Sequence, residues 1–85
     1  MYEYEKEKPK LFTDEGQRAF LKVRDNVFHL LKEAGAVRMT EALRGSTGDS
    51  WFQLACVDRM VELGEIRERT IPGEVAGQDR VFVKS

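Results

Sequence analysis

The sequence has few of the residues that cross-link a fold or bind a metal. Its 85 residues include one cysteine, Cys56, and one histidine, His29. A single cysteine excludes an internal disulfide and fits a reducing compartment. One cysteine and one histidine also cannot supply the four ligands of the usual structural zinc site. We therefore expect no metal and no other cofactor, and we expect the protein to be cytoplasmic.

Long apolar runs are missing as well. No run approaches the roughly 18 residues that a membrane helix needs, and residues 1–10 are too rich in Glu and Lys for a secretory signal. Hydrophobic residues make up 41% of the chain and charged residues 34%. This balance is typical of one small folded domain rather than a disordered chain. No membrane partner is expected.

Neither positive nor negative charge is concentrated in one segment of the chain. Lys and Arg number 14 against 15 Asp and Glu, and the net charge is −1. The absence of a strongly basic stretch weakens a nucleic-acid interpretation. Residues 1–10 alternate Glu and Lys around Tyr2 and Tyr4 and offer little apolar surface to bury. Residues 1–12 are therefore predicted to form a flexible N-terminal arm, whose tyrosines could dock on the remaining domain.

The domain itself, residues 13–85, opens with the clearest helical pattern in the chain. Thr13 is a suitable N-cap because its hydroxyl can accept a hydrogen bond from an unpaired backbone amide. Apolar residues then recur at helical spacing as far as Ala34. Gly35 follows, and glycine readily adopts the positive φ that ends many helices. The pattern predicts a long first helix between these two residues.

Shorter elements fill the rest of the chain. In order, the sequence predicts a brief extended piece (37–39), a short helix capped by Thr40 and running to Arg44, a turn (46–50), a helix (51–63) and two strands (65–71 and 80–84). Gly64 is predicted to close the third helix. The two strands are separated by a loop that contains glycines, which predicts a hairpin.

Alternation along the last strand raises a question about its two faces. Val81 and Val83 lie on one face, and Arg80, Phe82 and Lys84 lie on the other. A two-stranded hairpin can bury only one face against the helices. Either Phe82 or the valine pair is therefore left for a partner, such as the tyrosine arm or a second subunit.

The order of these elements resembles the winged helix-turn-helix superfamily across residues 13–85. Three stretches carry the resemblance: Val37–Leu43, Val57–Arg69 and Gly77–Val83. It implies a small α+β fold with three helices followed by a two-stranded antiparallel wing, and a recognition helix at about residues 50–63. The same fold serves DNA readers, RNA binders and protein-docking modules, so it does not fix the function.

In DNA-binding members of the superfamily the recognition helix enters the major groove. The resemblance carries this role to Ser46, Thr47, Ser50, Trp51, Leu54, Ala55 and Asp58, and it places Thr40, Arg44, Arg69 and Arg80 near phosphates. It favours a DNA-binding domain in a regulatory, transcription-related role. The partners expected from this interpretation are double-stranded DNA and, in a dimer, a second subunit.

An alternative follows from the charges of the third predicted helix. Its exposed arc is predicted to carry Trp51, Ala55, Asp58, Arg59 and Glu62. Two carboxylates suit a polyanion poorly. The alternative is a protein–protein interaction module that uses Trp51 and this acidic face and does not bind DNA. Trp51 has two interpretations here, as part of the core or as an exposed anchor.

No arrangement typical of catalysis is found. Cys56 lies in an apolar helical stripe, where thiols are inert, and His29 lies on a polar arc. The glycines at residues 45–48 lack the lysine of a phosphate-binding loop. We therefore do not expect an enzyme.

Overall fold

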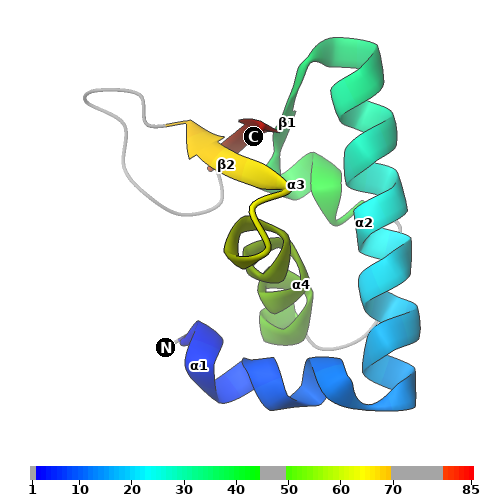
Figure 1. Ribbon diagram of the computed structural model, residues 1–85, viewed down its shortest axis with the longest axis vertical. Coiled ribbons are helices and arrows are strands. Elements are labelled where there is room, and N and C mark those ends of the chain that lie inside the picture. Colours follow the sequence, from blue (N-terminus) through cyan, green and yellow to red (C-terminus); the bar gives the residue numbers. More distant parts are fainter. Residues whose placement is uncertain (1, 45–49, 70–79) are drawn as a thin grey trace.

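The computed structural model describes residues 2–44, 50–69 and 80–85 of the chain. The elements in these ranges are α1 (Tyr4–Glu7), a 3-10 helix η1 (Lys8–Phe12), α2 (Asp14–Ala34), β1 (Ala36–Arg38), α3 (Met39–Ala42), α4 (Ser50–Glu62), β2 (Ile66–Arg69) and β3 (Val81–Lys84). The fold is α+β, as predicted. In Figure 1, α4 lies between the sheet and the N-terminal helices α1 and η1, with α2 along one side.

The ends of α2 lie where the sequence predicts them. At the start, the Thr13 hydroxyl accepts a hydrogen bond from the Gly16 amide at 3.0 Å. At the end, Gly35 has φ 78° and its amide donates to the Leu31 carbonyl. Both signals act within one turn of the chain, so the sequence alone is sufficient to locate them.

The sheet has three strands rather than the two of the predicted hairpin. The strand order is β1-β3-β2, and both pairs are antiparallel. Residues 36–38 form β1 by pairing with β3 near the end of the chain, with Val37 opposite Phe82. The predicted antiparallel pair of the last two strands is present. The third strand, β1, was predicted only as a brief extended piece, because three residues carry too little alternation to show that they pair with so distant a strand.

Strand β3 is central, and this decides which of its faces is buried. Phe82 is 0% exposed and lies between Val37 of β1 and Glu68 of β2. Val81 and Val83 point to the opposite face and are half-buried. The valine pair is therefore the face left uncovered by the helices.

The connection from α4 to the sheet agrees with the prediction, whereas the start of α3 does not. Gly64 has φ 77° directly after α4, and Ile66 turns back into the core with 1% exposure. Helix α3 begins at Met39, so Thr40 lies inside it rather than at its cap. The Arg38 amide donates instead to the Glu41 carboxylate at 3.2 Å, so Glu41 satisfies this end of the helix.

The N-terminal segment differs most from expectation. Residues 4–12 form α1 and η1 and pack against α2 and α4 rather than extending as an arm. Leu11 is 1% exposed and belongs to the core. The Gln17 side-chain amide donates through Nε2 to the Leu11 carbonyl at 2.5 Å. Leu11 and Phe12 are only two adjacent apolar residues after a charged stretch, and so short a run gives no periodic signal, so the sequence pattern does not reveal this packing.

The core lies between α2, α4 and the inner face of the sheet. Its members are Leu11, Phe20, Val23, Val27, Leu31, Val37, Met39, Ala42, Cys56, Val57, Met60, Ile66 and Phe82. The predicted apolar stripe of α2 supplies four of them, Phe20, Val23, Val27 and Leu31. Among the described residues, no helix combines the length and apolar character that crossing a membrane requires.

Candidate nucleic-acid interface

The N-terminal half of α4 presents a mixed polar and apolar surface. Ser50 is exposed, Trp51 is 43% exposed and Leu54 is half-buried. Of the two interpretations of Trp51, the structure supports surface exposure over burial in the core. These three candidates share one helix end, so the structure brings them together.

Ala55 was predicted to lie on the same exposed arc, but it is 0% exposed. The reason is visible one turn further along the same face of α4. The Arg59 guanidinium lies over the Phe12 ring, 5.3 Å from its centroid. The N-terminal segment thus covers this face of α4, whereas it was predicted to be a flexible arm from which only the tyrosines could dock.

The two carboxylates of α4 are held by partners from other segments of the chain and, for Glu62, also by Arg59 of the same helix. Asp58 accepts from the Arg80 guanidinium at 2.9 Å and from the Tyr2 hydroxyl at 2.6 Å. Glu62 accepts hydrogen bonds from three partners, the Tyr4 hydroxyl, the Lys8 ammonium and the Arg59 guanidinium. The predicted acidic face is therefore neutralised by the chain itself.

Arg80 is the centre of one of these networks. Its guanidinium donates to Asp58 of α4 and to Glu68 of β2, at 2.9 and 2.8 Å, and its side chain is 21% exposed. It also lies 5.1 Å from the centroid of the Phe82 ring. These contacts tie β2 and β3 to α4, so Arg80 acts within the fold as a structural link rather than as an open cation.

The remaining predicted site residues are scattered. Thr40 and Arg44 are exposed in α3 and just after it. Arg69 is exposed and, being opposite Val81, lies on the outer face of the sheet. The structure therefore does not bring Arg69 and Arg80 to one face. Ser46 and Thr47 lie outside the described residues.

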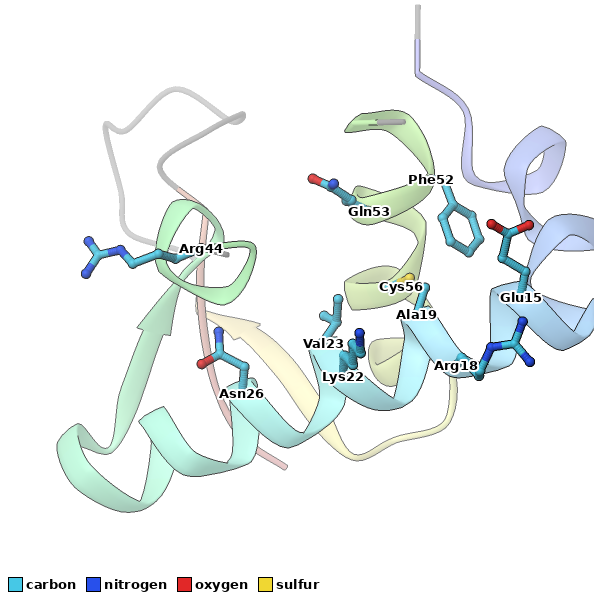
Figure 2. Close-up of a pocket in the computed structure, with 10 residues that line it drawn as sticks. All are labelled: Glu15, Arg18, Ala19, Lys22, Val23, Asn26, Arg44, Phe52, Gln53 and Cys56. Carbon is cyan, nitrogen blue, oxygen red and sulfur yellow. The ribbon is translucent and has the colours of Figure 1, made fainter. Parts of the chain in front are cut away.

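A groove of about 500 Å³ lies between α2 and α4 on one side of their packed core (Figure 2). The lining residues are Glu15, Arg18, Ala19, Lys22, Val23, Asn26, Arg44, Phe52, Gln53 and Cys56. Arg18 and Arg44 stand toward its two ends. Arg18 and Lys22 were not predicted to line a groove. They lie on the polar arc of α2, and periodicity does not show which part of that arc borders α4.

Cys56 lies in this groove between the helices and shows no sign of reactivity. Burial raises the pKa of its thiol to about 11, so the thiol stays protonated near neutral pH. His29 is exposed on α2. Within residues 2–44, 50–69 and 80–85, no three His, Cys, Asp or Glu side chains are grouped so that they could hold a metal ion.

The contacts of the N-terminal segment predict an unusual tyrosine titration. Burial, together with the hydrogen bond to Glu62, raises the pKa of Tyr4 from 10.0 to about 12. Burial and the hydrogen bond to Asp58 raise the pKa of Tyr2 as well. Because the folded-state pKa values are the higher ones, this docking stabilises the fold fully below pH 10 and is lost as the pH rises from about 10 towards 12.

Tyr2 and Tyr4 are the two tyrosines of the chain, so tyrosinate absorbance reports on them directly. At pH 10 the folded protein is expected to show little tyrosinate, whereas the urea-unfolded chain should be about half ionised. Tyr4→Phe should remove the group that ionises first in the folded protein. Half ionisation at pH 10 in the folded protein would show that the segment is not docked.

Comparisons of the chain with protein-family models, with curated proteins and with solved structures gave no match. What the candidate interface can bind is therefore inferred from the exposed end of α4 and from the charges that surround it.

Proposed function

We propose that this protein is a winged-helix DNA-binding domain with a regulatory role in transcription, and that the N-terminal half of α4 is its recognition element. The order of helix, short strand, short helix, helix and two strands agrees with the order that suggests this superfamily. The observation that carries the proposal is the neutralisation of the α4 carboxylates, because their charge was the main objection to DNA.

The charge balance around α4 supports this step. The described residues 50–69 contain four carboxylates, Asp58, Glu62, Glu65 and Glu68, and each forms an ion pair. Glu65, for example, accepts two hydrogen bonds from Arg24, at 2.9 and 2.7 Å. A paired carboxylate repels phosphate much less than an open one. The nearby Arg44 forms no ion pair within the described ranges.

The exposed end of α4 offers the chemistry that a duplex requires. The Ser50 hydroxyl and the first backbone amides of this 13-residue helix are groups that contact phosphates. Leu54 offers apolar contact to a thymine methyl group. Trp51 adds a large rigid surface beside them. Arg44, which precedes the helix in the chain, supplies a charge for the DNA backbone.

A duplex of arbitrary sequence provides the test, with binding followed by fluorescence anisotropy. Affinity is expected to fall steeply between about 50 and 200 mM salt, because counterions are released when cations meet phosphates. Arg44→Glu should weaken binding about tenfold. It should also lower the slope of log affinity against log salt concentration by about one, which corresponds to the loss of one phosphate contact. Lys32→Glu, an equal charge change on the exposed side of α2, is the matched control and should have a smaller effect.

The exposure of Trp51 favours one rival function, docking on another protein. Tryptophan is the commonest type of anchor in such interfaces, and 43% of its surface is open here. In that case Trp51→Ala would abolish capture of the protein partner, with little influence of salt. An absence of duplex binding even at low salt would contradict the DNA proposal and leave docking as the better explanation.

A further inference from the structure

The outer face of the sheet combines three arginines with an apolar centre. Residues opposite each other in a sheet point to the same face. Arg38, Val81 and Arg69 form one row across β1, β3 and β2, and Ala36, Val83 and Arg67 form the next. The three arginines are exposed, while Val81 and Val83 are half-buried. We call this face, made of these six residues, the outer sheet face.

Within the described ranges, no acidic residue belongs to this face, and the neighbouring Glu41 carboxylate bonds the backbone amide of Arg38 and not its guanidinium. All six of its residues are basic or apolar. The guanidinium groups of Arg38, Arg67 and Arg69 make no ion pair or ring contact with the described residues, whereas Arg24, Arg59 and Arg80 are each ion-paired. Positive charge around two valines is complementary to an acidic surface that also carries apolar side chains.

We propose that the outer sheet face binds an acidic, partly apolar segment of another protein. Arginine suits this partner because its planar fork binds carboxylates with two parallel hydrogen bonds. Arg67 and Arg69 lie about 7 Å apart along one face of β2. The same spacing separates alternate side chains of an extended peptide, so two carboxylates at alternate positions can reach both arginines.

The arginines and valines of the outer sheet face also argue against two other binding partners. A second copy of the chain stacked face to face would bring arginines against arginines, and like charges repel. A DNA backbone would satisfy the arginines but offers no apolar group for Val81 and Val83. This surface is separate from the end of α4 assigned to DNA, so it goes beyond the proposed function and its failure would leave that proposal untouched.

The full chain is tested with a fluorescein-labelled peptide of mixed Glu and Leu residues, by fluorescence anisotropy. Reversing both charges, Arg67→Glu with Arg69→Glu, is expected to weaken peptide binding at least about tenfold. Val83→Thr keeps the shape and the strand preference of the side chain and should weaken binding several-fold. A peptide with Gln in place of Glu should bind poorly, and so should one with Ser in place of Leu.

Lys84→Glu is the matched control, because Lys84 is exposed on the same strand but lies opposite Ile66, on the other face. It should leave peptide affinity within about twofold. Circular dichroism should show all variants folded, since the substituted side chains are exposed or half-buried. Peptide binding that survives the double reversal would overturn the proposal. So would loss of duplex binding in that variant with peptide binding unchanged, because the outer sheet face would then be a DNA surface.

Discussion

Replacing Phe82 by alanine is expected to lower the free energy of unfolding by about 3–5 kcal/mol. Phe82 is 0% exposed at the centre of the middle strand, and its neighbours on the adjacent strands are Val37 and Glu68. Removing the ring leaves a cavity between the sheet and the helices. Stabilities of small domains are about 5–15 kcal/mol in total, so this substitution removes a large share. Urea unfolding followed by circular dichroism measures the loss.

Val83→Ala is the control for this prediction. Val83 is one residue further along β3 but points to the outer sheet face, where it is half-buried. Its truncation is expected to cost less than about 1.5 kcal/mol, because fewer neighbours lose contact. Equal losses for the two variants would show that the sheet does not bury the Phe82 face, and the assignment of inner and outer faces would fail with it.

Gly16→Ala is expected to destabilise the protein by about 2–3 kcal/mol, although alanine is the better helix former by about 1 kcal/mol. A Cβ atom at Gly16 would lie 1.9 Å from the Lys10 carbonyl oxygen and 3.0 Å from the Leu11 Cα. These are backbone atoms, so no side-chain rotation relieves the contact. The N-terminal segment must move away from α2, and Leu11 must leave the core.

Two measurements test the effect of Gly16→Ala. Thermal unfolding should occur at lower temperature, and tyrosinate should appear nearer pH 10, because Tyr2 and Tyr4 lose their contacts with Asp58 and Glu62. Arg18→Ala, two residues along α2 at an exposed position, should change stability by less than about 0.5 kcal/mol. A more stable Gly16→Ala variant would contradict the packing of η1 on α2.

The same N-terminal segment limits how α4 can meet a duplex. The Tyr2 and Tyr4 hydroxyls bond the carboxylates in the C-terminal half of α4. The first turns of α4, which carry Ser50 and Trp51, therefore stay accessible to a duplex. The resemblance placed the recognition helix at about residues 50–63, with candidate contacts that extend along it as far as Asp58. The structure narrows the candidate interface to one end, and it turns Arg80 from a predicted phosphate contact into a link between strand and helix.

Only part of the candidate interface could be predicted from the sequence. The surface location of Ser50 follows from its position at a helix start. Trp51 could not be assigned in the same way, because a tryptophan in an amphipathic helix fits either the core or the surface. Asp58 was predicted to lie on the exposed arc, but its side chain is 15% exposed. Its partners Tyr2 and Arg80 lie 56 and 22 residues away in the chain. Local patterns contain no information about such contacts.

The sequence by itself determined the features that depend on neighbouring residues. Thr13 and Gly35 set the ends of α2, and Gly64 followed by Ile66 sets the exit from α4, because capping and positive φ act within about one turn. The tertiary structure alone decided that β1 joins β3, that Leu11 enters the core and that the carboxylates of α4 are neutralised. Each of these contacts joins segments far apart in the chain, so it forms only when the helices and strands have packed together.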